Sequence, residues 1–183
     1  MVFASRRVAA VDQCVFPAGV RQRVSAARPA LTEAQLATVE AAARQWFRLF
    51  ARRPSSSLAV PSVLVGDWWR EFVRHEREYA AFVEAAVGRA LPYSDAAGTV
   101  AATYREARRD EKADLPLIFR VDQEAGVPDA RRYLADCGGR GQCFDVAGVV
   151  CLQHLGGPGR ATRGDFKGPP GAVDLGSDIG GGL

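Results

Sequence analysis

The sequence predicts a mainly α-helical protein: a compact domain of four to five helices, with a Cys/His loop region and a glycine-rich C-terminal tail. Three observations predict this class. Apolar residues recur at steps of three and four along much of the chain, as on the buried face of a helix. Alternating runs long enough to build a sheet are absent. The 183 residues, 48% of them hydrophobic, are enough for one real core.

The helical domain is expected over residues 31–155, between an irregular arm over residues 1–30 and a flexible tail over residues 156–183. The arm shows no sustained apolar period, and the tail combines many glycines with no apolar period at all. We therefore expect that deleting residues 157–183 leaves the thermal midpoint of the protein nearly unchanged.

The first helix is expected to begin at Thr32 and to end near Arg53. Thr32 can cap the helix while Gln35 returns a hydrogen bond to the backbone of the cap, and Pro54 follows the end. Apolar residues at three- and four-residue steps predict its buried face: Leu36, Val39, Ala43, Trp46, Phe47 and Phe50.

Further helices are expected along the rest of the domain. A second helical region runs from Ser62 to about Ala90, with Gly66 as its weakest point, and a third follows Pro92. Shorter elements are expected after them: a helix over residues 115–126, a helical turn over residues 128–137, and a strand or hairpin over residues 144–152.

The charge balance argues against a nucleic-acid or membrane partner. The chain has 24 basic and 21 acidic residues, a formal net charge of +3, which is too balanced to attract a polyanion by itself. Arg44, Arg48 and Arg52 recur every four residues, which is typical of a solvated helix face and, as a weaker alternative, of a phosphate-binding stripe. No apolar run reaches the ~18 residues of a membrane helix. The N-terminus lacks a secretory signal, so we expect a cytoplasmic protein.

Three cysteines and a histidine are the strongest chemical clue. Cys137, Cys143, Cys151 and His154 are spaced C-x5-C-x7-C-x2-H, and zinc takes such a tetrahedral set of ligands in closed structural sites. The first gap is wider than the usual two to four residues, so buried cysteines beside a surface histidine are an alternative of about equal weight. An iron–sulfur cluster is a lesser alternative. Four protein ligands would make the zinc structural, whereas an open position would make it catalytic.

The other histidine, His75, is expected on a helix near Glu71, Glu78 and Tyr79, which lie three or four residues away. Such a histidine can act as a general base or a metal ligand, but local ion pairs are the commoner arrangement. A di-iron bundle is excluded because neither histidine has an acidic residue three positions before it. The sequence offers no nucleophile triad, phosphate loop or dinucleotide fingerprint.

Two segments, VPSVLVGDWWREFVRHEREYAAF and LPLIFRVDQEAGVPDARRYLADCGGRGQC with VCLQHL, resemble bacterial relatives of the glycine-rich domain-containing protein family. In that family a helix carries a Val-Asp-x-x-Trp-His pattern followed by a tyrosine, and a glycine-rich tail is common. Trp69 and Tyr79 match the pattern, whereas Gly66 occupies the Asp position and Arg70 replaces the His. The resemblance implies a helical fold and leaves any reaction open.

The sequence therefore predicts a small cytoplasmic helical binding or accessory protein whose Cys/His loop is stabilised by zinc. The alternative is a small metalloenzyme in which the same metal, or His75, carries out the chemistry. A pocket lined by Arg70, His75 and Tyr79, with Trp69 as the fourth candidate binding residue, would favour the enzyme. Four protein ligands without a cleft would favour the accessory role.

Overall fold

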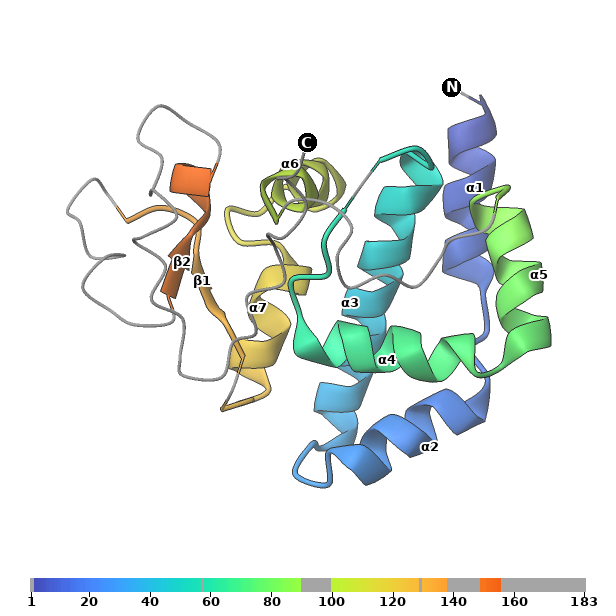
Figure 1. The fold of residues 1–183 in the computed structure, drawn as a ribbon, viewed down its shortest axis with the longest axis horizontal. Helices are drawn as coiled ribbons and strands as arrows, with labels where there is room; N and C mark the ends of the chain where they lie inside the picture. The colour runs from blue at the N-terminus through green and yellow to red at the C-terminus, as the bar shows by residue number, and fades with distance from the viewer. Residues whose placement is uncertain (1, 57, 90–99, 129, 138–148, 156–183) are drawn as a thin grey trace, which may run out of the picture.

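The computed structural model describes residues 2–56, 58–89, 100–128, 130–137 and 149–155. This part of the chain confirms the mainly helical class (Figure 1). None of the helices in it is long and apolar enough to cross a bilayer. The elements follow in the order α1 (Val2–Gln13), α2 (Ala18–Ala27), α3 (Glu33–Arg52), α4 (Val63–Val73), α5 (Glu76–Ala86), α6 (Val100–Asp110), α7 (Leu117–Glu124), β1 (Arg132–Leu134), β2 (Val149–Cys151) and the 3-10 turn η1 (Leu152–Leu155).

The long helix α3 lies at the centre and is crossed by α4 (Figure 1). Its start is the predicted capping box: Gln35 N donates to Thr32 Oγ1 at 3.2 Å, and Thr32 N donates to Gln35 Oε1 at 2.9 Å. It ends at Arg52, before Pro54. All the apolar residues predicted for its inner face are buried. The sequence pattern alone therefore predicts where this helix begins and ends and which of its faces is buried.

Residues 2–27 differ from the expected irregular arm, because they form the helices α1 and α2. α1 packs against α3 and α5, and α2 packs against α4. Their inward residues are few and small; Val11, Val20 and Val24 are completely buried. Since so sparse an apolar pattern gives little helical signal in the sequence, these helices owe their stability to tertiary packing.

The helical region expected over residues 62–90 is divided into α4 and α5 by a turn at His75. Gly66, the expected weak point, lies inside α4. A straight helix over both spans would be roughly 36 Å long and would carry its second half past the core. The turn instead returns α5 to the core, where the ring of Phe82 lies 4.9 Å from that of Phe47.

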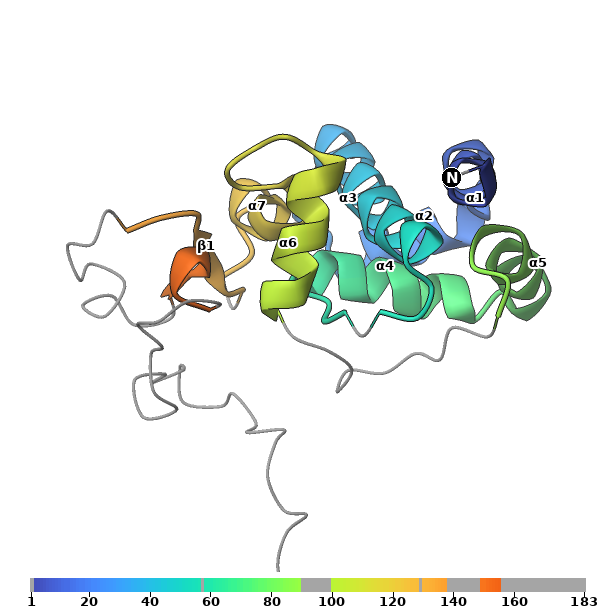
Figure 2. The same ribbon diagram turned by 90° about the horizontal axis from the view of Figure 1, so that it is seen from above.

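α6 and α7 lie between α3 and the two strands (Figure 2). The helical turn expected over residues 128–137 is wrong, because residues 132–134 form β1, which pairs in parallel with β2. β1 shows the exposed–buried–exposed alternation of a strand, with Tyr133 inward, but three residues are too few for that period to be recognised in the sequence. β2 confirms a short strand within residues 144–152.

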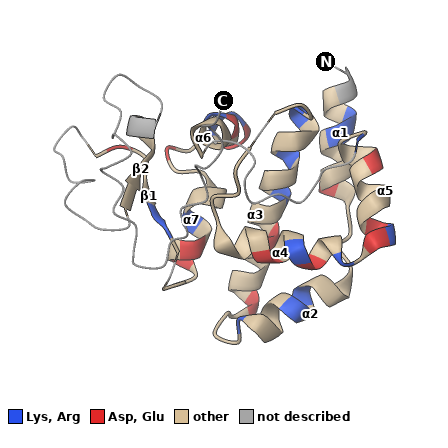
Figure 3. Ribbon diagram, viewed as in Figure 1, with Lys and Arg blue, Asp and Glu red and all other residues tan. Residues whose placement is uncertain are grey.

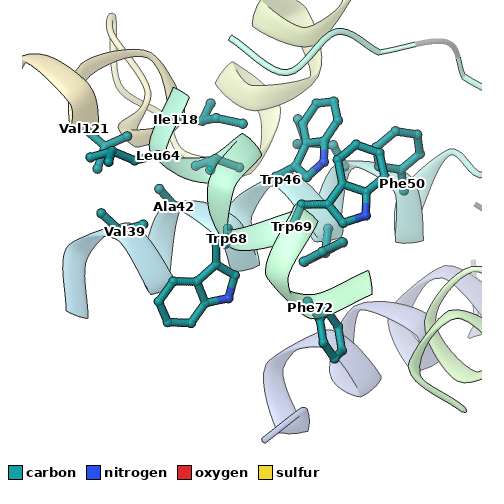
Figure 4. Packing of buried hydrophobic residues seen from close by; sticks show 14 of the residues in the cluster. Val39, Ala42, Trp46, Phe50, Leu64, Trp68, Trp69, Phe72, Ile118 and Val121 are labelled. Atoms are coloured by element: carbon teal, nitrogen blue, oxygen red, sulfur yellow. The ribbon is translucent and has the colours of Figure 1, made fainter. Parts of the chain in front are cut away.

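The core combines aromatic side chains of α3 and α4 with aliphatic ones from these helices and α7 (Figure 4). Phe47 is completely buried, and its ring meets those of Trp69 and Phe72 edge-on at 6.3 and 6.1 Å between centroids. Trp46 meets Phe50 in the same way at 4.8 Å. Edge-to-face pairs of this kind add about 0.5–1.5 kcal/mol each to the free energy gained by burial.

A buried carboxylate joins α7 to the start of α4. Asp122 is 3% exposed and accepts hydrogen bonds from Ser62 Oγ at 2.6 Å, Val63 N at 2.7 Å and Leu64 N at 3.2 Å. The first N–H groups of a helix have no partner within it, and the helix dipole favours a negative charge there. Thr103 of α6 holds the preceding loop, because its hydroxyl donates to the carbonyl of residue 59 at 2.9 Å. Later elements of the chain thus complete the start of α4.

The start of α7 is completed in the same way by side chains from elsewhere. Leu117 N donates to Glu111 Oε2 at 2.7 Å, and Ile118 N donates to Gln45 Oε1 at 2.9 Å. Burial by itself raises the pKa of Glu111, but hydrogen bonds from Leu117 N, Gln45 and Arg120 outweigh it and lower that pKa. Gln45 thereby fixes α7, and with it the strands that follow, against α3.

Candidate metal centre and neighbouring sites

Two of the predicted metal ligands meet at the carboxyl end of the strand pair. Cys151 ends β2 and pairs in register with Leu134, the last residue of β1, and Cys137 follows three residues later. The sulfur atoms of Cys137 and Cys151 and a carboxylate oxygen of Asp136 all lie within 4.8 Å of one another. Both cysteines are 5% exposed, whereas Asp136 is exposed. The cluster therefore has a buried sulfur side and an outer oxygen side.

The other two predicted ligands are not placed by the structure. Cys143 lies outside the described residues, and for His154 only the backbone, in η1, is described. Asp136 is a residue that the sequence reasoning missed. Its signal was its position directly before Cys137, because neighbouring residues in a turning segment can present both side chains to one ion.

Aromatic rings connect the strands to the helices. Tyr133 of β1 packs edge-on against Phe119 of α7 at 5.1 Å, and Phe119 meets Tyr104 of α6 at 5.6 Å between ring centroids. The hydroxyl of Tyr133 donates to the carbonyl of Pro61 at 3.2 Å, and burial raises the pKa of Tyr133 to about 12. The phenol therefore remains a hydrogen-bond donor throughout the physiological pH range.

Tyr104 places the cysteine cluster beside α6. Its hydroxyl donates to the carbonyl of Asp114 at 2.8 Å. Burial raises the pKa of Tyr104, the charge of Arg108 lowers it, and negative charges on Asp114 and Cys151 raise it again. η1, which follows Cys151, contacts α6, so the end of β2 lies close to the helical part of the protein.

The second candidate site, at Trp69, Arg70, His75 and Tyr79, is organised as helix packing. Trp69 is 2% exposed, and its indole N–H donates to the hydroxyl of Tyr79 at 3.0 Å, which ties α4 to α5. Burial raises the pKa of Tyr79, and the hydrogen bond from Trp69 lowers it by less. Arg70 pairs with Asp67 at 2.7 Å, and Asp67 also pairs with Arg28, the residue that follows α2, at 2.9 Å. Trp69, Arg70 and Tyr79 thus make contacts that hold the helices together.

His75 packs against α2. Its ring atoms Cε1 and Nε2 lie 3.0 Å from where a side chain at residue 19 would place its Cβ, so only Gly19 allows this approach without displacement. Nε2 is buried and has no hydrogen-bond partner among the residues that the structure describes. Its expected neighbour Glu71 pairs with Arg74 at 3.4 Å and with Arg23 at 3.9 Å. A buried Nε2 is poorly placed to exchange a proton with a substrate.

The arginine stripe of α3 was expected to be a solvated face, but its side chains are only 21–34% exposed and bind neighbouring helices. Arg44 donates to a carbonyl near the end of α1 at 2.9 Å, and Arg48 pairs with Asp12 at 2.8 Å. Arg48 and Arg52 both pair with Asp110 of α6, whose side chain is 7% exposed. Figure 3 shows acidic and basic residues interleaved over the helices. The stripe thus fastens α3 to α1 and α6, and its charge is largely neutralised.

Comparison with known proteins gives one match. The sequence model of the UCP032817-like family matches residues 6–155. This range extends from α1 to η1 and includes the cysteine cluster and the Trp69–Tyr79 pair. Searches of the curated proteins and of the solved structures find no match. Because the match covers most of the chain, the protein belongs to the UCP032817-like family.

Proposed function

We propose that the protein is a small zinc-binding accessory module, in which Cys137 and Cys151 hold a structural zinc ion at the end of the strand pair. The observation that carries the proposal is the approach of two buried cysteine sulfur atoms to within 4.8 Å of each other, with a carboxylate oxygen of Asp136 within 4.8 Å of both. Cys143 and His154, which the sequence predicts as further ligands, stay predictions.

The geometry suits a thiophilic metal ion. Two thiolates that bind zinc at ~2.3 Å in a tetrahedral site lie about 3.8 Å apart. The two sulfur atoms are already within 4.8 Å, so small side-chain rotations would complete the approach. Thiolate charge is costly in a buried place unless a cation neutralises it, and zinc supplies that charge.

A structural role suits the element that carries the ligands. β1 and β2 are each three residues long and, in the described residues, form a sheet of two strands. A two-stranded sheet is at best marginally stable without further support. An ion shared between Cys137, after β1, and Cys151, at the end of β2, would lock the pairing. It would also hold the strands against α6 and α7.

The alternative, a metalloenzyme that uses His75, has less support. His75 lies at the turn between α4 and α5 and packs against Gly19, with its Nε2 buried. The cysteine cluster adjoins α6 and the strands. Any catalytic role therefore rests on the metal itself and on a coordination position that protein ligands leave open.

Elemental analysis of protein purified without added metal tests the proposal. We expect about one zinc per chain, and a strong chelator should lower the thermal midpoint because binding is coupled to folding. Cys137→Ser and Cys151→Ser should each lose both zinc and stability. Cys14→Ser is the matched control: Cys14 is a free cysteine beyond the end of α1 and should change neither.

Two results would overturn the proposal. One is a folded, metal-free protein whose stability ignores the chelator and whose thiols react freely with a thiol reagent. The other is a disulfide between Cys137 and Cys151 in protein purified under reducing conditions, since a disulfide would occupy both sulfur atoms.

A further inference from the structure

The carboxylate beside the two thiols has the position of a third ligand. A Cys137 sulfur, a Cys151 sulfur and an Asp136 oxygen form a triangle with no side longer than 4.8 Å. A tetrahedral zinc with a carboxylate oxygen at ~2.1 Å and a thiolate at ~2.3 Å separates these two atoms by about 3.6 Å. One ion can therefore be reached from all three groups after modest side-chain rotation.

The three groups differ in burial, so one side of the cluster is closed to solvent and the other is open to it. Both thiols are 5% exposed, whereas Asp136 is exposed to solvent. Zinc held by the sulfur atoms would be screened from water on the inner side and reached from outside past the carboxylate. Carboxylates also bind zinc less tightly than thiolates do, so the outer ligand is the one that exchanges first.

We propose that Asp136 is the third metal ligand and the exchangeable one, through which the ion enters and leaves the site. This inference rests on the proposed zinc-binding function and extends it to the regulation of metal loading. It adds a residue that the Cys/His spacing does not predict. It also assigns the three groups different roles: the thiolates determine which metal is held, and the carboxylate determines how fast it is exchanged.

Two substitutions at residue 136 test the inference on the full chain. Asp136→Asn removes the charge of the ligand, and Asp136→Cys replaces its oxygen by a third thiolate. The exposed Glu33, whose side chain is 81% exposed in the first turn of α3, provides the control Glu33→Gln. Each protein is loaded with zinc, and the rate of zinc transfer to an excess of a coloured chelator is measured. Each is also loaded with cobalt(II), whose sulfur-to-metal charge-transfer absorption grows with the number of bound thiolates.

We expect Asp136→Asn to lose zinc at least about tenfold faster than the wild type, since even the loss of an outer partner of a ligand weakens binding by about 10–100-fold. Asp136→Cys should lose zinc more slowly and should raise the cobalt charge-transfer absorption by one thiolate's share. Glu33→Gln should behave as the wild type.

The two proposals fail in different ways. Wild-type protein that binds neither zinc nor cobalt overturns both. Wild-type protein that binds one ion, while Asp136→Asn releases it at the wild-type rate and Asp136→Cys adds no charge-transfer absorption, overturns the role of Asp136 alone.

Discussion

Replacing Asp122 by asparagine tests how much of the stability depends on the buried clamp between α7 and α4. The side chain keeps its volume, but an NH₂ donor takes the place of one acceptor oxygen. If the remaining oxygen stays with Ser62 Oγ and Leu64 N, the NH₂ group faces the N–H of Val63, and two donors oppose each other. Flipping the amide instead turns the NH₂ group toward the N–H of Leu64, where two donors again oppose each other.

We expect Asp122→Asn to lower the free energy of unfolding by at least about 3 kcal/mol. A hydrogen bond to a charged group contributes about 1.5–3 kcal/mol, and one of the three is lost. The other two become neutral hydrogen bonds of about half the strength. The favourable interaction between the carboxylate and the start of α4, roughly 0.3–2 kcal/mol, is lost as well.

Urea unfolding, followed by tryptophan fluorescence, measures this change as a lower midpoint. The matched control is Asp114→Asn, at a carboxylate that is 91% exposed in the loop before α7; it should change the free energy of unfolding by less than about 0.5 kcal/mol. If Asp122→Asn stayed within that margin of the wild type, the clamp would not be a main source of stability.

Other contacts lead to equally direct expectations. Gly19→Ala should lower the thermal midpoint, because the new Cβ would lie 3.0 Å from His75, although alanine favours a helix by up to about 1 kcal/mol over glycine. In a His75→Ala background the same change should be neutral or stabilising. An equal loss of thermal midpoint in both backgrounds would contradict the contact. Tyr133→Phe should cost about 1 kcal/mol. Folding raises the pKa of Tyr133 from its ordinary value of about 10 to about 12, so the wild type should lose stability as the pH rises through this range. The urea midpoint of Tyr133→Phe should fall less than that of the wild type over the same range. Glu111→Gln should flatten the acid side of the same profile: the pKa of Glu111 is lowered on folding, so its contribution is present above about pH 4.3 and is lost as pH falls through the folded value.

The sequence predicts α3 in detail because its signals are local. Thr32 and Gln35 form the cap, Pro54 follows the end, and the buried residues keep a regular period. α1 and α2 were not predicted, since what makes them helices is contact with α3, α4 and α5. The turn at His75 has the same origin: residues 62–90 are acceptable in a continuous helix, and only the packing of α5 on the core requires the break.

The candidate metal centre was predicted in part for a similar reason. Clustering in the sequence identifies Cys137 and Cys151, and the parallel pairing of β1 with β2 brings them together. The only signal for Asp136 in the sequence is its position before Cys137, because its distance to Cys151 depends on the register of the two strands. Cys143 and His154 remain predictions. The resemblance to the glycine-rich domain-containing proteins also remains a prediction, since the family model that matches the chain is that of the UCP032817-like family.

The contacts that complete the start of α4 also constrain how the chain can be made. Thr103, Asp122 and Tyr133 reach back across 44, 60 and 72 residues to the segment from Ala59 to Ser62. During synthesis on the ribosome, α1 to α5 emerge well before these partners. The start of α4 therefore remains incomplete until β1 leaves the exit tunnel, although its aromatic side chains can already pack on α3. A fragment that ends before residue 133 lacks the hydrogen bond to Pro61 and the packing of Tyr133 on Phe119, and it should therefore be less stable than the whole chain.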